Sequence, residues 1–316
     1  MHSAKHARAH ALPSGKVDKL LRSLVKHRYI YLMLLPVVAY YLLFHYANIY
    51  YAVIAFQDFK PMRGIEGSRF VGLKHFTSFL TGVHAWRLIR NTLLINFYQI
   101  LFSFSSSILF ALMINQMADN RYKGIVQTVT YMPHFISIVV VCGLLIEFSE
   151  SSSIFNDVLA VFGVERSSLL ANPQNFRTLF VGSDMWQNMG WGTIIYLATL
   201  SGVDQALHEA ATIDGAGRVR RILHINIPAL MPIIAIQLIM RVGRMMLVGY
   251  EKVILLYSPA IYETADVISS YVYRRGLYEM NYSYGAAVGL FNSVVNLIIL
   301  CSANAFSRRV TGNSLW

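Results

Sequence analysis

Four long segments of this chain contain no Asp, Glu, Lys or Arg: residues 29–56, 91–118, 124–146 and 280–307. Each exceeds the roughly 20 residues that a helix needs to cross the hydrocarbon core of a bilayer. Water is absent there, so a spanning segment must satisfy its own backbone hydrogen bonds, as a helix does. With 55% apolar and only 14% charged residues, the composition also excludes an ordinary soluble protein.

Two further windows are apolar but carry charged groups. Residues 178–203 include Asp184, and residues 225–250 include Arg241 and Arg244. Charges inside a span usually face a cavity or a partner, so we interpret both windows as spans with an internal function. The sequence therefore predicts an all-α polytopic membrane protein with six transmembrane helices.

The distribution of basic residues predicts the orientation. With the N-terminus inside, the cytoplasmic pieces hold fourteen Lys and Arg against five Asp and Glu, whereas the outer loops are nearly balanced. Short loops rich in Lys and Arg remain in the cytoplasm. We expect a basic cytoplasmic tail over 1–28, a transmembrane domain over 29–307 with a cytoplasmic loop at 204–224, and a cytoplasmic tail over 308–316. This bias accounts for the net charge of +11 without nucleic acid.

No pattern in the sequence indicates a metal site, a disulfide or a catalytic centre. Cys142 and Cys301 both lie in apolar runs. His2, His6 and His10 are spaced four apart but have no carboxylate support, so we expect no metal. Because no nucleophile or paired carboxylates share one depth, a membrane-embedded enzyme is not favoured.

The loop between the fourth and fifth windows has its own local structure. Asp204 is a plausible N-cap for a short helix, and Gly215 and Gly217 would end that helix and turn the chain. A second short helix is expected over Val219 to His224, before Pro228 begins the next span. A DNA-binding helix-turn-helix is disfavoured because the adjoining spans leave no room to reach a major groove.

The same loop carries a specific spacing: E-A-A, three residues, G, nine residues, and I-x-L-P, with isoleucine instead of leucine at Ile227. This spacing resembles the signature loop of bacterial ABC importer permeases. The resemblance extends over nearly the whole chain, through YLMLLP at 31–36, FVGLKHF at 70–76 and AAVGLFNSVVN at 286–296. It is closest to the sugar-importer permeases related to the maltose system, in the branch that handles large or acidic oligosaccharides such as pectin and alginate fragments.

This resemblance implies a type I ABC importer permease fold in the bacterial cytoplasmic (inner) membrane. It also implies that the loop is a coupling helix docked on a cytoplasmic ATPase. The residues expected to contact the ATPase, called the coupling-motif residues below, are Glu209, Ala210, Ala211, Asp214, Gly215, Arg218, Ile225 and Pro228. Asp214 and Arg218 lie between the fixed positions of the motif and belong to its charged rim. The alternative for these residues is a solvated basic loop that obeys the positive-inside rule.

The implied partners are a second permease in a heterodimer, two ATPase subunits, an extracellular or periplasmic sugar-binding protein, membrane lipid and the oligosaccharide itself. The chain has no G-x-x-x-x-G-K-[ST] sequence to cradle phosphates. We therefore expect it to bind no cofactor, with ATP and magnesium held by the ATPase subunits.

Polar residues within the spans are the candidates for the substrate pathway: Asp184, Trp186, Gln187, Asn188, Trp191, Arg241, Arg244, Asn292 and Asn296. A guanidinium can bind the carboxylate of an acidic sugar with two hydrogen bonds, and an indole can stack on a sugar ring. The alternatives are an ion pair of an arginine with Asp184, arginines that extend to the outer interface, and amides that pack helices together. Asn91, Asn96 and Gln99 are weaker candidates, and we expect His134 to be a hydrogen-bonded core residue.

We interpret the chain as the transmembrane permease subunit of an ATP-driven importer of oligosaccharides, including acidic, uronate-containing fragments. The alternative is an ion-coupled secondary transporter of a polar solute. That class would be expected to show inverted repeats and acidic groups in the middle of spans. The chain shows no convincing repeat, and Asp184 is the one carboxylate clearly inside a predicted span.

Overall fold

The structure is a computed structural model that describes residues 26–118, 120–312, 314 and 315. Most of the predicted N-terminal tail, including His2, His6 and His10, lies outside the described residues, as does Asp119. The chain divides after Val53 into two compact units, which we describe separately.

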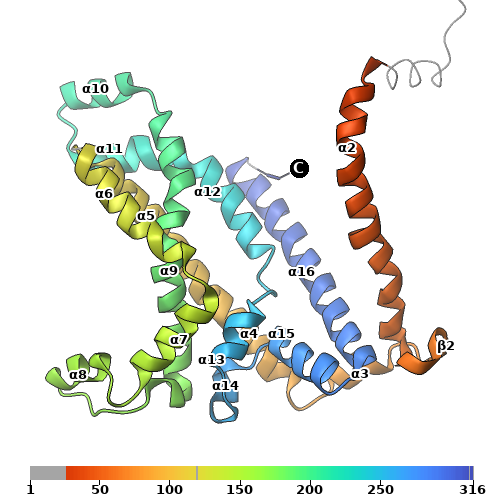
Figure 1. The fold of residues 1–316 in the computed structure, drawn as a ribbon. Helices are drawn as coiled ribbons and strands as arrows, with labels where there is room; N and C mark the ends of the chain where they lie inside the picture. Colours follow the sequence, from red (N-terminus) through yellow and green to blue (C-terminus); the bar gives the residue numbers. More distant parts are fainter. Residues whose placement is uncertain (1–25, 119, 313, 316) are drawn as a thin grey trace, which may run out of the picture. The chain divides into compact units, whose positions relative to one another are not determined.

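The first unit is built on one helical run. It contains α2 (Arg28–Tyr41), a π-helical segment (Leu42–Tyr46) and most of a 3-10 segment (Ala47–Phe56) (Figure 1). The whole run, Arg28–Phe56, is long and apolar enough to cross a membrane, and it coincides with the predicted span over 29–56.

The second unit is helical except for a small hairpin. Strand β1 (Gln57–Lys60) pairs antiparallel with β2 (Gly64–Phe70), and a 3-10 turn (Pro61–Arg63) joins them. The long helical runs are α4 to α5 (Ala85–Asn115), α6 (Asn120–Tyr131), α7 (Ile138–Ser149), α9 (Pro173–Ser201), α11 to α12 (Arg218–Val242) and α16 (Tyr282–Thr311). The shorter helices are α3 (Lys74–Leu80), α8 (Ile154–Val161), α10 (Gln205–Ile213), α13 (Tyr250–Leu256), α14 (Tyr262–Ala265) and α15 (Ile268–Val272).

Length and apolar composition together identify four described helices that could cross a membrane, or five if the bent pair α6 and α7 forms one span. The predicted fourth span corresponds to α9. At 29 residues, α9 would be about 43 Å long, enough to cross, but its sequence is too polar to be identified by composition. Its polar residues therefore need partners other than lipid.

The predicted span over 124–146 is not one straight helix. Helices α6 and α7 meet at an angle of 94°, with a 3-10 turn (Met132–Phe135) at the break. Pro133 is the second residue of this turn, and Ile136 after the turn is extended. The Ser137 side chain then accepts a hydrogen bond from the Val139 backbone N–H and caps α7. The prediction of a continuous helix was wrong because the proline and the cap together restart the helix in a new direction.

The predicted span over 225–250 is also shorter than expected as a helix. Helix α12 ends at Val242, and residues 243–246 form a turn before α13. Arg241 therefore lies in the last turn of α12, while Arg244 lies beyond it. The prediction that both arginines share one helix was wrong because the helix stops at Gly243.

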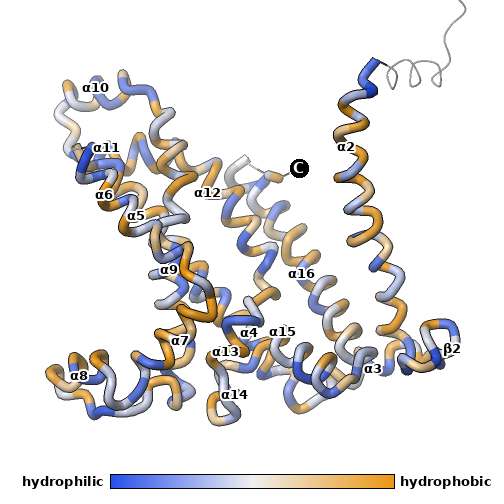
Figure 2. Tube along the Cα trace, in the orientation of Figure 1, coloured by the Kyte–Doolittle hydropathy of each residue, from blue (hydrophilic) through white to orange (hydrophobic). Residues whose placement is uncertain are grey.

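The long helices of the second unit give it two distinct ends. Helix α10 and the C-terminal end of α16 lie at one end, while α8, α13 and α14 lie at the other (Figure 1). Figure 2 shows hydrophilic positions at α11 beside α10, and largely hydrophobic stretches along α12 and α16. The first of these ends therefore carries the predicted cytoplasmic loop.

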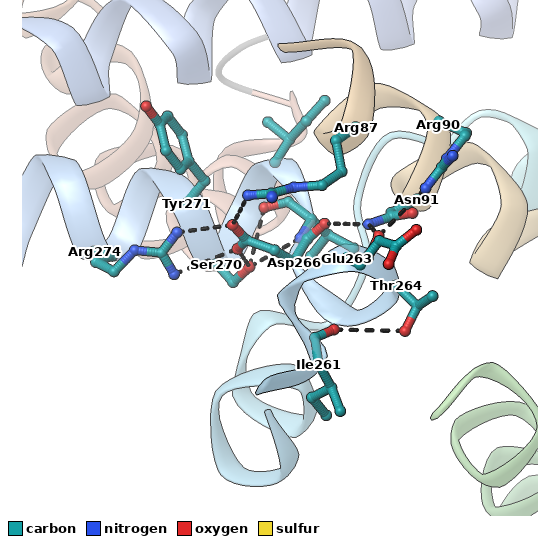
Figure 3. A network of polar contacts seen from close by, with 12 residues as sticks. Arg87, Arg90, Asn91, Ile261, Glu263, Thr264, Asp266, Ser270, Tyr271 and Arg274 are labelled. Atoms are coloured by element: carbon teal, nitrogen blue, oxygen red, sulfur yellow. Dashed lines mark hydrogen bonds and ion pairs between the residues drawn. The ribbon is translucent and has the colours of Figure 1, made fainter. Parts of the chain in front are cut away.

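At the opposite end, a buried carboxylate holds the loop helices to α4. Asp266 is fully buried and pairs with Arg274 at 2.8 Å and with Arg87 at 3.6 Å (Figure 3). Asn91 donates hydrogen bonds to the backbone oxygens of Glu263 and Asp266. Although burial opposes the charged form, the hydrogen bond to Asp266 raises the pKa of Arg274 above its usual value. The loop is thereby attached to the helix that lines the cavity described next.

Candidate functional site

A polar cavity of about 510 Å³ opens between three helical segments of the second unit. Its walls come from α4 to α5, from α9, and from α12 with the turn that follows. The lining residues are Asn96, Gln99, Ser103, Phe104, Ser107, Asp184, Asn188, Trp191, Gly192, Tyr196, Gln237, Met240, Arg241, Arg244 and Leu247. This volume lies within the roughly 300 to 1,000 Å³ typical of small-molecule sites.

The wall from α4 to α5 is a polar stripe. Asn96, Gln99, Ser103 and Ser107 follow one another three or four residues apart, so they lie on one face of a helix. The sequence indicates Asn96 and Gln99 only as weaker candidates for the pathway, and it does not single out Ser103 or Ser107. The helical period of the four residues was the signal that could have identified this wall.

The wall from α9 contains three of the predicted pathway residues, Asp184, Asn188 and Trp191. Asn188 donates a hydrogen bond from Nδ2 to Asp184 Oδ1 at 3.1 Å. The other carboxylate oxygen of Asp184 is buried and has no hydrogen-bond partner among the described residues. This second oxygen is the one that lies beside Arg241.

The predicted pair of charged residues also meets in this cavity. Asp184 and Arg241 lie 3.6 Å apart, without a hydrogen bond between them in the described part of the chain. Arg244 is exposed, and its guanidinium has no carboxylate partner among those residues. Two guanidinium groups thus face one carboxylate, so the lining keeps a surplus positive charge. The ion pair that the sequence offered as an alternative is therefore present, beside a second arginine of the same lining.

Trp186 and Gln187 do not line this cavity. Trp186 borders a separate apolar groove with Leu144 and Phe155. Gln187 is buried and donates a hydrogen bond to the Ile136 backbone oxygen at 3.0 Å. The helical period explains both positions. Gln187 is one residue from Asn188 and points about 100° away from it, and Trp186 is two residues from both Asp184 and Asn188 and points about 160° away from them.

Asn292 and Asn296 of α16 also lie outside the cavity lining. Asn292 donates to the Met246 backbone oxygen at 3.0 Å. Asn296 donates to the Gly243 oxygen and accepts from the Met246 backbone N–H. Carbonyl groups past the end of a buried helix need donors, and these two amides supply them. The asparagines therefore hold the turn that carries Arg244.

The predicted coupling loop forms a capped helix. Asp204 accepts a hydrogen bond from the Ala206 backbone N–H at 2.9 Å, as expected of an N-cap. At the other end, Gly215 has a φ of +74°, and the Ala216 N–H bonds to the Ala211 oxygen at 2.8 Å. This pattern is a Schellman motif, which suits glycine because it has no Cβ.

Most of the coupling-motif residues are exposed. They are Glu209, Ala210, Asp214, Gly215, Arg218 and Pro228, whereas Ala211 and Ile225 are half-buried. Leu207 and Ile213 are also exposed, so α10 presents charged and apolar groups together. Residues Val219 to His224 are helical, as predicted, but they are not separate from the next span, because α11 continues through a π-helical segment (Ile222–Asn226) into α12.

Among the described residues, no group of three His, Cys, Asp or Glu side chains could hold a metal ion. A polar cavity walled by helices that are long enough to cross a bilayer, with a capped helix at one end, is the architecture of a polytopic membrane transport protein. This conclusion sets the class, and comparison with known proteins gives the family.

A family model for the inner membrane component of binding-protein-dependent transport systems matches residues 103–312. The chain belongs to this family, and it is a permease subunit of an ABC importer rather than an enzyme. The comparisons do not favour the alternative of an ion-coupled secondary transporter.

Individual relatives agree with this assignment. The chain is 39% identical, over 93% of its length and 92% of the relative's, to the polygalacturonan/rhamnogalacturonan transport system permease protein YteP of Bacillus subtilis. It is 36% identical to protein LplB of the same organism, over 98% of this chain and 97% of LplB. A solved chain of a bacterial alginate ABC transporter, in complex with an alginate pentasaccharide-bound periplasmic protein, matches with a TM-score of 0.87 and 38% identity. That match covers 94% of this chain and 100% of the other, and it supports the ABC importer permease fold.

Proposed function

We propose that this chain carries acidic, uronate-containing oligosaccharides across the cytoplasmic membrane. The observation that carries the proposal is the surplus positive charge of the cavity, where Arg241 and Arg244 face Asp184 alone. The names of two similar proteins support it, since polygalacturonan and alginate are both acidic polysaccharides.

Different lining residues recognise different chemical groups of such a sugar. Arg244, with help from Arg241, binds a substrate carboxylate, because a guanidinium matches a carboxylate as a two-pronged donor. Trp191 stacks on a sugar ring. The amides of Asn96 and Gln99 exchange hydrogen bonds with hydroxyl groups.

The chain works within a larger assembly. A second, different permease completes the pathway, two ATPase subunits hold ATP and magnesium, and an external binding protein delivers the sugar. Helix α10 docks on an ATPase subunit through its exposed Glu209, Leu207 and Ile213. Both termini lie in the cytoplasm, with tails over 1–28 and 308–316 around the transmembrane domain. The common location of α10 and the C-terminal end of α16 supports this orientation (Figure 1).

The substitutions Arg241→Gln and Arg244→Gln test the charge of the cavity. Uptake of an acidic oligosaccharide by the reconstituted transporter is compared with uptake of the same sugar after methyl esterification, which removes charge and keeps the rings. We expect each variant to lower uptake of the acid by about tenfold or more, because a hydrogen bond to a charged group contributes about 1.5 to 3 kcal/mol. Uptake of the ester should change little.

Arg275→Gln is the matched control, because Arg275 is exposed and pairs with Glu279 in the loop before α16. It should leave the ratio of acid to ester uptake unchanged. Equal losses for acid and ester in Arg241→Gln and Arg244→Gln would instead indicate that the arginines serve a structural ion pair.

A further inference from the structure

The bend between α6 and α7 lies against α9 (Figure 1). The His134 imidazole stacks on the Trp191 indole, with ring centroids 4.5 Å apart and planes 5° from parallel. Phe135 meets the same indole edge-on, at 5.6 Å and 83°. Gln187 bonds to the Ile136 backbone oxygen. Two residues of α9, Gln187 and Trp191, thus hold the bend against the cavity wall.

A chain of polar contacts leads from the bend to the charged residues. His134 Nδ1 lies 3.0 Å from Asn188 Oδ1, and Asn188 Nδ2 donates to Asp184 Oδ1. The opposite orientation of this amide would place its oxygen against the carboxylate, where neither atom could donate. The Asn188 oxygen is therefore the acceptor for His134, and Nδ1 of His134 carries the hydrogen. Asp184 in turn faces Arg241.

The stacking has a consequence for Trp191. The imidazole covers one face of the indole, and Phe135 covers part of its edge. The Trp191 side chain nevertheless lines the cavity and is 43% exposed. One face of the ring is thus held by protein, and the other is open to a ligand.

We propose that His134 is a positioning residue that sets the selectivity of the cavity for acidic sugars. Its ring fixes Trp191 as a one-sided platform for a sugar ring. Its Nδ1–H, acting through Asn188, fixes the Asp184 carboxylate beside Arg241. A neutral sugar needs only the platform, whereas an acidic sugar needs the platform and the ordered charges. This inference rests on the proposed function, because it concerns the same cavity.

Two substitutions separate the two contacts of His134. His134→Phe keeps a ring over Trp191 and removes the donor to Asn188. His134→Asn keeps a donor at about the position of Nδ1 and removes the ring. Thr128→Val is the control, since the Thr128 hydroxyl is exposed and bonds to the Gly124 oxygen of its own helix.

Competition between an acidic oligosaccharide and its methyl ester in one vesicle preparation gives the ratio of their kcat/KM values, independent of the amount of protein. We expect His134→Phe to lower this ratio about three- to tenfold, the effect of losing one hydrogen bond. We expect His134→Asn to lower uptake of both sugars and to change the ratio less. Thr128→Val should match the wild type.

The fluorescence of Trp191 reports its stacking with His134 directly. For each protein, this signal is the difference in fluorescence between that protein and the same protein carrying Trp191→Phe. His134→Asn should alter this difference signal, because it uncovers one face of the indole. An unchanged ratio in His134→Phe, or an unchanged signal in His134→Asn, would overturn the inference. If the wild type itself does not prefer the acid, the proposed function fails; if it does and His134→Phe keeps that preference, only the inference fails.

Discussion

Gly190 lies where α9 crosses α6. A Cβ atom at this position would overlap the Thr130 backbone oxygen and would also meet the Thr130 side chain at 3.0 Å. Two helices approach closely where a small residue lets their backbones meet. The absence of a side chain at Gly190 therefore determines how near the α6–α7 bend can come to the cavity wall.

Gly190→Ala should destabilise the folded protein by about 1 to 3 kcal/mol, because a buried backbone contact cannot accommodate the added methyl group. Gly182→Ala is the matched control on α9, since a Cβ there meets nothing within 4 Å. Fluorescence-detected size-exclusion chromatography after heating measures the apparent Tm of both variants. A similar Tm for the two variants would show that α6 shifts to make room.

The candidate pathway residues show how far single positions could be predicted. The indoles of Trp186 and Trp191 were both predicted to face the substrate, yet five residues on a helix rotate the side chain by about 140°. Only Trp191 lines the cavity. Helical geometry alone could have separated them. The role of Asn292 and Asn296 could not be predicted, because the turn that they hold is visible only once α12 is seen to end at Val242.

Among the helices, α10 is the one whose ends were predicted most closely. Asp204 caps its start, and Gly215 ends it with a positive φ, both as the sequence indicated. The bend of α6 and α7 was missed, because Pro133 alone predicts a kink and says nothing of its size. The 94° bend between α6 and α7 is accompanied by tertiary contacts with α9. The pattern of apolar residues along α6 and α7 cannot reveal these contacts.

Gly215→Ala tests the Schellman motif at the end of α10. An alanine at a positive φ costs roughly 1 to 2 kcal/mol, so the helix end should loosen and the transmission of ATP-driven motion should weaken. We expect binding-protein-stimulated ATP hydrolysis to fall about fivefold or more in the assembled transporter. Gly217→Ala is the control two residues later, because Gly217 has a φ of −67° and no atom within 4 Å of a Cβ. Equal activity in the two variants would show that the predicted coupling loop tolerates the strain.

At the scale of the whole molecule, the long charge-free segments were enough to predict an all-α membrane protein. The number of spans was harder to predict, because α9 is long enough but polar, and α6 and α7 are separately too short. Helix α9 lines the candidate cavity, and the bend between α6 and α7 packs against α9. Hydropathy is thus least informative where helices contact one another and a polar solute instead of lipid.

Transport by the whole assembly should depend on ATP and not on ion gradients. Proteoliposomes with ATP on the cytoplasmic face of the transporter should continue uptake after ionophores collapse the gradients of protons and sodium. Uptake should stop when the ATPase subunits are omitted, because the chain has no phosphate-binding loop of its own. Uptake that survives this omission would contradict the assignment of the energy source.

The contacts that hold the α6–α7 bend have a consequence for biogenesis. Gln187 and Asn188 follow Ile136 and His134 by 51 and 54 residues in the chain. The ribosome therefore releases α6 and α7 before the residues that hold them in place exist. During synthesis the bend has only Pro133 and the Ser137 cap to shape it, and it is completed once α9 has entered the membrane. A nascent chain stopped before Gln187 should carry an unfinished cavity wall, and that is the stage at which a chaperone or quality-control protease would recognise it.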